Sequence, residues 1–233
     1  MNFLDQTLLP WLHHMVATNA PALPLRGVMQ VHLALGWAVV LAWLGVWVLK
    51  QHKQQMCAAA VLALWALVPG PWSPTYWLGL AFQAPSVLSV LLCAVLLHRA
   101  LTQQVVTDAV VRSSRNSLLA FVIMGAALGW VLLLDTFAVL PVQLYAWGFS
   151  PAAVALVVLA TALPWAISLR GPLDPLAWTA PLAVALFVLL RLPTGNVWDA
   201  VLDPWLWVVL QVILVQRWRA REKKEPQANY SLR

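Results

Sequence analysis

Charged side chains are scarce along the whole chain. Only 9% of the 233 residues are Asp, Glu, Lys or Arg, whereas soluble domains carry about 25%. The chain is instead 62% hydrophobic, with a mean hydropathy of +0.80. A chain of this length has too little polar surface to cover so much apolar surface in water. The composition therefore excludes an ordinary soluble domain and predicts an all-α integral membrane protein.

Cysteines and catalytic motifs are equally scarce. The two cysteines, Cys57 and Cys93, lie far apart and form no CxxC pair, so we expect structural thiols rather than a disulfide. The chain has no HExxH motif and no glycine-rich phosphate loop. Gly148-Phe-Ser150 lacks the second glycine of a nucleophile elbow. These absences favour a protein that is not an enzyme.

Long apolar runs are abundant, and they predict about seven transmembrane helices. The run at 56–68 is the shortest, so it needs a tilted neighbour or a locally thin bilayer, and six crossings result if it does not span. We expect a surface helix or loop at 101–116, and a helix N-cap at Ser150-Pro151. The predicted spans are 28–49, 56–68, 76–97, 118–134, 152–169, 176–190 and 201–216.

Proline, glycine and aromatic residues concentrate between Ala66 and Ser86. This stretch predicts an outer hairpin followed by a broken or kinked helix, because Gln83 and Pro85 interrupt the third apolar run. Pro164 predicts a second kink. A proline within a span frees a carbonyl that a neighbour must satisfy. Such a kink is either purely structural or, as in many transporters, the border of a binding site.

The two ends of the chain differ from the apolar centre. Residues 1–27 predict a short N-terminal helix lying in the membrane interface on the outer side, with His13 and His14 on its polar face. Residues 28–216 form the predicted polytopic membrane domain, and residues 217–233 form a basic cytoplasmic tail.

The basic residues predict the orientation of the protein. With seven crossings and a cytoplasmic tail, all of the 14 Lys and Arg residues except Arg26 and Arg191 lie on the cytoplasmic side. This asymmetry follows the positive-inside rule and indicates an inner (plasma) membrane protein with its N-terminus outside. The 15 tryptophans suit membrane-interface belts. The net charge of +6 then reflects topology and anionic lipid rather than nucleic acid.

This orientation gathers ionisable residues at the outer face, where we predict a polar cluster. Arg191 is expected to pair with an aspartate there, either as a structural clamp between the ends of three spans or as a substrate-anion site. No cofactor is predicted, although the histidines of this cluster leave a haem or metal site as an alternative. The cluster consists of His13, His14, His32, Asp135, Arg191, Asp199 and Asp203.

Three functions agree with these observations. The first is a non-enzymatic inner-membrane subunit or assembly partner, whose short second span a partner protein or another copy of the chain would cover. The second is a small solute or ion permease with a path beside Pro85 and Pro164. The third is a membrane enzyme or haem or metal protein with its site on the outer face. The expected partners are the lipid bilayer and a membrane protein or a second copy.

Overall fold

The computed structural model describes residues 17, 23–103, 108–168 and 175–222. Over these residues the chain is all-α, as predicted, and contains no strand. The predicted interfacial helix with His13 and His14, the turn at 170–174 and the end of the tail lie outside the described residues. The elements are α2 (Arg26–Val48), α3 (His52–Leu67), α4 (Pro74–Phe82), α5 (Val87–Leu101), α6 (Asp108–Thr136), α7 (Leu144–Trp147), α8 (Pro151–Ser168), the 3-10 helix η2 (Pro175–Trp178), α9 (Thr179–Leu190), α10 (Val197–Val201) and α11 (Pro204–Glu222).

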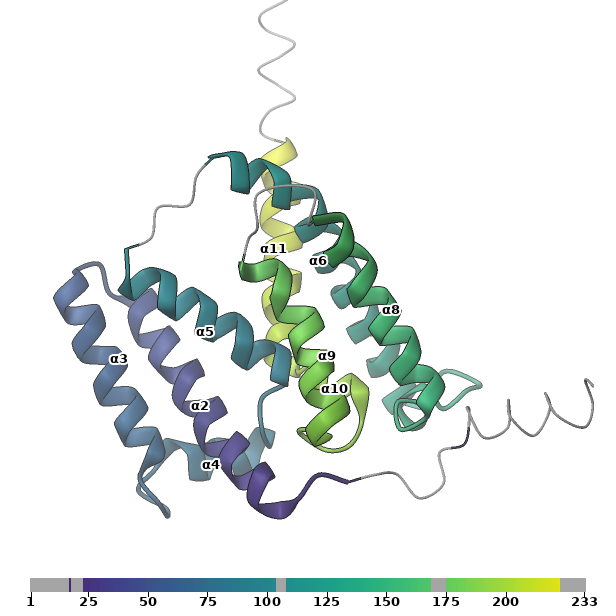
Figure 1. Cartoon of the computed structure of the whole chain (residues 1–233), viewed down its shortest axis with the longest axis horizontal. Helices are drawn as coiled ribbons and strands as arrows, with labels where there is room; N and C mark the ends of the chain where they lie inside the picture. Colours follow the sequence, from purple (N-terminus) through teal and green to yellow (C-terminus); the bar gives the residue numbers. More distant parts are fainter. Residues whose placement is uncertain (1–16, 18–22, 104–107, 169–174, 223–233) are drawn as a thin grey trace, which may run out of the picture.

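The long helices run back and forth between two ends of the molecule (Figure 1). α2, α8 and α11 rise toward the top of Figure 1, and α3, α6 and α9 descend. α4 lies at the lower end, and α5 leads from it toward the upper end beside α2. Each of the seven predicted apolar segments therefore corresponds to a helix or a pair of helices.

The boundaries of several elements differ from the prediction. α3 already begins at His52, which lengthens the shortest segment to 16 residues. The surface segment expected at 101–116 gives way to a single 29-residue helix, α6, that starts at Asp108. The last long helix, α11, begins at Pro204 rather than at Val201, where the last apolar segment was predicted to begin, because α10 forms a separate short helix before it. α8 continues through Pro164 to Ser168.

Serine side chains fix the starts of three helices. Ser150 accepts a hydrogen bond from the Ala153 N–H at 3.2 Å, which confirms the predicted N-cap before Pro151. Ser73 caps α4 and Ser86 caps α5 in the same way. Because an N-cap satisfies a backbone N–H that has no partner inside its helix, these three residues help to decide where each helix begins.

Apolar side chains cover much of the outside of the molecule. Two segments, Arg26–Val48 and Leu119–Thr136, are long and apolar enough to cross a membrane, yet only 28% and 17% of their apolar windows are buried. A helix that is apolar all round is normally either buried in a protein core or surrounded by lipid. The largest cluster of buried apolar residues lies where α5, α8 and α9 meet residues 192–200, and smaller clusters lie between α6 and α11 and between α2 and α3.

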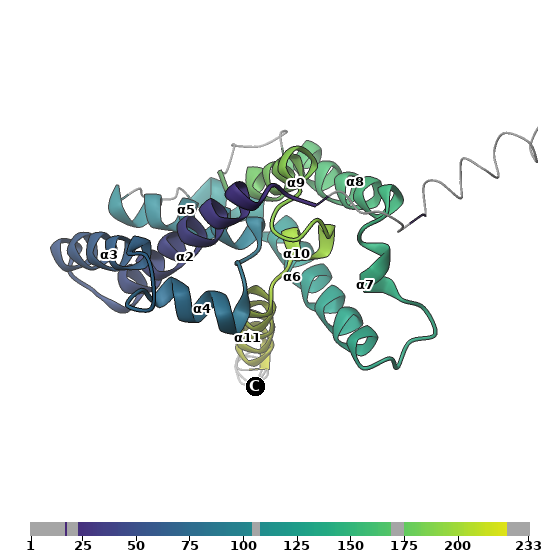
Figure 2. The same cartoon turned by 90° about the horizontal axis from the view of Figure 1, so that it is seen from below.

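A close contact joins α6 to α11. A Cβ atom at Gly129 would collide with the indole of Trp207, and one at Gly125 would come within 2.6 Å of Leu210. The Trp207 Nε1–H in turn donates to the carbonyl of Ala126 at 3.2 Å. Small residues spaced four apart let two apolar helices approach closely. Figure 2, seen from below, shows α6 and α11 on the opposite side of the molecule from α8 and α9.

Candidate functional site

The connection between α9 and α11 is the most buried loop of the described chain. We call residues 191–203 the hub segment; Leu192, Asn196, Val197, Ala200 and Asp203 are all buried within it. Connections usually run over the surface, because a buried loop must find hydrogen-bond partners for its backbone. The side chains that supply those partners form the candidate site.

Asp203 links two helices that are far apart in the sequence. Its Oδ2 accepts a hydrogen bond from the Ser86 N–H at 2.8 Å, at the start of α5. Its Oδ1 accepts one from the Leu206 N–H at 2.7 Å, in the first turn of α11. The N-termini of both helices carry partial positive charge, so one buried carboxylate serves as the anion for two helix ends. Asp203 is only 9% exposed.

The break between α4 and α5 is held from the side by α2. The Trp37 Nε1–H donates to the Gln83 carbonyl at 2.8 Å, and His32 Nε2 lies 2.9 Å from the Pro85 carbonyl oxygen. Because a carbonyl can only accept, Nε2 of His32 carries the proton. Gln83 has φ 61° and ψ −150°, a region that glycine normally occupies. The predicted break is therefore present, with its freed carbonyls satisfied by side chains of a neighbouring helix.

A second polar group centres on Tyr145 in α7. The Asp135 carboxylate, at the end of α6, accepts a hydrogen bond from the Tyr145 N–H at 2.7 Å. The Tyr145 hydroxyl donates to Asp199 Oδ2 at 2.7 Å, and the Thr194 hydroxyl donates to the same oxygen at 2.5 Å. Burial, followed by the hydrogen bond to Asp199, raises the pKa of Tyr145 above its ordinary value.

Asn196 fastens the hub segment to α7. Its Nδ2 donates to the Tyr145 carbonyl at 2.9 Å, and its Oδ1 caps α10 by accepting from the Trp198 N–H at 3.0 Å. Gly148 faces this asparagine so closely that a Cβ atom would overlap Asn196 Oδ1. The Val197 N–H donates to the Gly148 carbonyl at 3.1 Å. The absence of a side chain at position 148 thus allows the two segments to dock.

The structure brings together only part of the predicted outer cluster. Asp135 and Asp199 both bind Tyr145. Tyr145, which was not part of the predicted cluster, connects the end of α6 to the hub segment through these two aspartates. His32 and Asp203 both contact the break between α4 and α5. His32, in α2, binds the Pro85 carbonyl, and Asp203, before α11, accepts from the Ser86 N–H.

The expected ion pair of Arg191 is absent from the described residues, so that prediction was wrong. Arg191 has a left-handed backbone (φ 57°) at the end of α9, and its guanidinium lies over the ring of Phe187, 5.4 Å from the centroid. The three aspartates are already satisfied by backbone N–H groups and hydroxyls. Gln83 contributes through its backbone carbonyl.

Several residues of the site were not predicted. Ser86 follows a proline and precedes an apolar run, so the reasoning that identified Ser150 as an N-cap would have found it. Three contacts gave no such signal, because their partners are 46 to 54 residues away along the chain: Trp37 with Gln83, Tyr145 with Asp199, and Asn196 with Tyr145.

The described residues offer no evident place for a metal ion. No three His, Cys, Asp or Glu side chains converge among residues 17, 23–103, 108–168 and 175–222, and both cysteines are free thiols. Searches of known protein families, curated proteins and solved structures find no match to this chain.

Proposed function

We propose that the protein is a multi-pass inner-membrane protein, with its N-terminus outside and its C-terminus in the cytoplasm. The apolar, largely exposed surfaces of α2 and α6 support a lipid environment. In Figure 1 the starts of α3 and α6 lie toward the same end of the molecule as the end of α11. That end carries Lys50, Lys53 and Arg219, as the positive-inside rule requires of the cytoplasmic side.

Within that membrane, we propose a non-enzymatic role as a subunit or assembly partner of a larger complex. The observation that carries this proposal is α3. Among its described residues only Ala59 and Ala66 are buried, and α3 lies at the edge of the molecule beside α2 (Figure 1). Its 16 residues rise about 24 Å, less than the roughly 30 Å of hydrocarbon. A helix too short for the bilayer gains most from a neighbouring protein helix.

The exposed surface of α3 suits an apolar partner helix. Cys57, Ala60, Val61 and Leu64 are all exposed, and their spacing places them on one face. Cys57 and Ala60, the small residues at the N-terminal end of this face, allow a second helix to approach closely, as in other membrane helix pairs. We expect the partner to be a transmembrane helix of another protein or of a second copy.

The polar interior supports a scaffold rather than a catalyst. The buried carboxylate of Asp203 and the carbonyls of Gln83 and Pro85 are all occupied by partners within the chain. A catalytic or transport site needs polar groups that are available to a substrate. Here the same groups hold α2, α5 and α11 in place, which gives the outer end of the molecule a fixed shape.

Intact-complex mass measurement in mild detergent tests this role. We expect the wild-type protein to run as part of a stoichiometric assembly, and the double variant Ala60→Trp/Leu64→Trp to dissociate from it. Leu189→Trp is the matched control, because Leu189 is 77% exposed on α9 and would face lipid alone. A folded wild-type monomer, or equal dissociation by the control, would contradict the proposal.

A permease is the second candidate, and the broken α4–α5 helix favours it. Discontinuous helices with exposed carbonyls and helix N-termini build the binding sites of many transporters. In this reading, release of Asp203 from the Ser86 N–H would free the start of α5 for a solute. Because an amide oxygen holds the Ser86 N–H less strongly than a carboxylate does, uptake into proteoliposomes should then rise in Asp203→Asn. No uptake by wild-type protein over a panel of small anions and cations would remove this candidate.

A further inference from the structure

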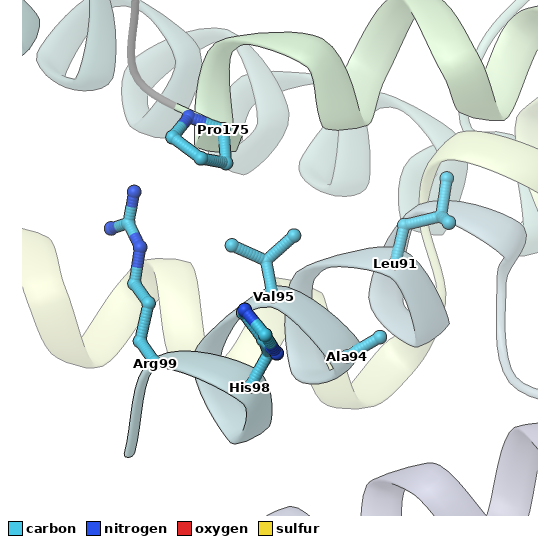
Figure 3. A pocket seen from close by; sticks show the side chains of 6 residues that line it. All are labelled: Leu91, Ala94, Val95, His98, Arg99 and Pro175. Atoms are coloured by element: carbon cyan, nitrogen blue, oxygen red, sulfur yellow. The ribbon is translucent and has the colours of Figure 1, made fainter. Parts of the chain in front are cut away.

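Two apolar surfaces stand out on the described chain besides those of the long helices. One is a groove of about 230 Å³ between α5 and η2, where Leu91, Ala94 and Val95 lie opposite Pro175 (Figure 3). No contact among the described residues indicates what fills this groove. The other surface is the outer hairpin, which we define as residues 66–82, from the end of α3 to the end of α4. Its own hydrogen bonds indicate what surrounds it.

The outer hairpin carries exposed apolar side chains and no charge. α4 lies at the lower end of the molecule in Figure 1, the end that the proposed orientation places outside. No residue from 66 to 82 is Asp, Glu, Lys or Arg. A monomer in water seldom exposes such a surface, which normally meets lipid or another protein. The exposed side chains are Leu67, Val68, Trp72, Tyr76, Trp77, Leu80 and Phe82.

The turn of the hairpin satisfies three of its backbone carbonyls with side chains. The Trp65 Nε1–H donates to the Trp72 carbonyl at 2.8 Å, and the Trp77 Nε1–H donates to the Pro71 carbonyl at 2.8 Å. The Ser73 hydroxyl donates to the Ala66 carbonyl at 2.9 Å. A turn that stands in water needs no such partners, because water itself can bond to its carbonyls. In hydrocarbon, irregular backbone must find its partners within the protein.

The turn also has few backbone donors. Pro69, Pro71 and Pro74 have no N–H group. The Val68 N–H donates to the Trp65 carbonyl at 3.2 Å. Few backbone groups of the turn are therefore left for water to bond.

The indoles of Trp65 and Trp77 can leave water without losing a hydrogen bond. Their N–H groups already donate within the protein, yet the two residues are 51% and 60% exposed. A tryptophan at a bilayer surface normally keeps its N–H near water or headgroups. Because the N–H is satisfied here, each ring can lie deeper, among acyl chains.

We propose that the outer hairpin is immersed in the acyl-chain region of the outer leaflet and does not stand in water beyond it. The inference rests on the membrane placement proposed above. Protein interfaces normally include hydrogen bonds between the partners, whereas the three turn carbonyls are already occupied, so lipid suits this surface better than a protein does. The hairpin leaves Ala60 and Leu64 of α3 exposed, so a partner helix can still bind there.

Site-directed spin labelling of the full-length protein in phosphatidylcholine vesicles tests the proposal. Cys57 and Cys93 are replaced by alanine, and one new cysteine carries a nitroxide. Collisions with oxygen report hydrocarbon around the label, and collisions with a water-soluble nickel chelate report water. Val68→Cys places the label in the hairpin, and Gln54→Cys places it at the opposite end of α3, where Gln54 is exposed. We expect about tenfold fewer nickel collisions at Val68 than at Gln54, because a polar chelate partitions poorly into hydrocarbon.

Two tryptophan variants test whether the internal hydrogen bonds permit immersion. Trp77→Phe keeps an aromatic ring but leaves the Pro71 carbonyl without its indole donor. The ratio of nickel to oxygen collisions at Val68 should then rise about fivefold, which corresponds to the loss of one net hydrogen bond. Trp72→Phe is the matched control, because its indole is not one of the two that bond to the turn carbonyls, and it should leave the ratio unchanged. Circular dichroism checks helix content, and Leu80→Cys, at a position 68% exposed on α4, repeats the measurement if Val68→Cys does not fold.

Three results would overturn the inference. Frequent nickel collisions at Val68 would place the hairpin in water, and few collisions with either reagent would place it under a protein partner. Equal effects of Trp77→Phe and Trp72→Phe would show that the indole bonds do not matter for immersion. A label at Leu189, which is 77% exposed on α9, separates these outcomes from failure of the proposed function. Nickel collisions at Leu189 refute the membrane placement, whereas oxygen collisions at Leu189 with nickel collisions at Val68 refute only the immersion of the hairpin.

Discussion

Asp203 should be the most sensitive polar residue of the described chain. Replacing it with alanine removes both acceptors from the Ser86 and Leu206 N–H groups. The Ser86 N–H is buried, and leaving such a donor without a partner destabilises by about 1–3 kcal/mol. Loss of the N-cap of α11 adds about 1 kcal/mol. We therefore expect Asp203→Ala to lower the free energy of unfolding by about 2–4 kcal/mol.

Thermal unfolding in detergent micelles, followed by circular dichroism, measures this effect. At roughly 2–4 °C of Tm per kcal/mol for a chain of this size, Asp203→Ala should lower Tm by about 4–16 °C. Asp203→Asn should fall between Ala and wild type, because its amide oxygen can accept one N–H while its NH₂ group faces the other.

Asp135→Ala is the matched control for Asp203→Ala. Asp135 also accepts one backbone N–H, that of Tyr145, but it is partly exposed. Water can take over as acceptor there, so we expect a loss of only about 0.5–1 kcal/mol. If Asp203→Ala unfolds within 2 °C of wild type, or no earlier than Asp135→Ala, the carboxylate does not join α5 to α11 as described.

Three further predictions concern the hub and the helix break. Gly148→Ala should destabilise by at least about 2 kcal/mol, because its Cβ would overlap Asn196, whereas Gly27→Ala, with open space around it, should be neutral or stabilising in the same melts. Gln83→Gly should raise Tm, since it relieves a backbone conformation that disfavours side chains by about 1–3 kcal/mol; a lower Tm would refute the strain. Burial and then the hydrogen bond to Asp199 raise the pKa of the Tyr145 phenol. The stability gained from the neutral phenol is therefore complete below the unfolded-state pKa of 10.0 and is lost as the pH rises through the higher folded-state value. Alkaline titration of tyrosinate absorbance, compared with Tyr145→Phe, checks this, and a phenol that ionises at its ordinary pKa would contradict it.

The broken helix shows how far local sequence signals reach. Pro85 removes a backbone donor and restricts the residue before it, so a break could be predicted without any knowledge of the fold. Which groups satisfy the freed carbonyls could not, because His32 and Trp37 are 53 and 46 residues away. In the sequence Gln83 stands out as a polar side chain within an apolar run. In the structure its backbone conformation ends α4, and its backbone carbonyl accepts the hydrogen bond from Trp37.

Arg191 illustrates the opposite case. It is an isolated basic residue among aspartates, and the sequence therefore favoured an ion pair. In the structure the aspartates accept from Ser86, Leu206 and Tyr145, and the left-handed turn at Arg191 directs its guanidinium over Phe187. Charge alone did not determine the pairing, because backbone N–H groups at helix starts compete for the same carboxylates.

The sequence by itself determined the helical class, the approximate course of the apolar segments and the positions of the helix break and the Ser150 cap. These features follow from periodicity, proline and capping, which act over a few residues. Only the tertiary structure decided that residues 191–203 are buried, that Asp203 serves two helices and that Tyr145 joins Asp135 to Asp199. These contacts link residues from 10 to 117 positions apart, and the packing of whole helices must exist before such partners meet.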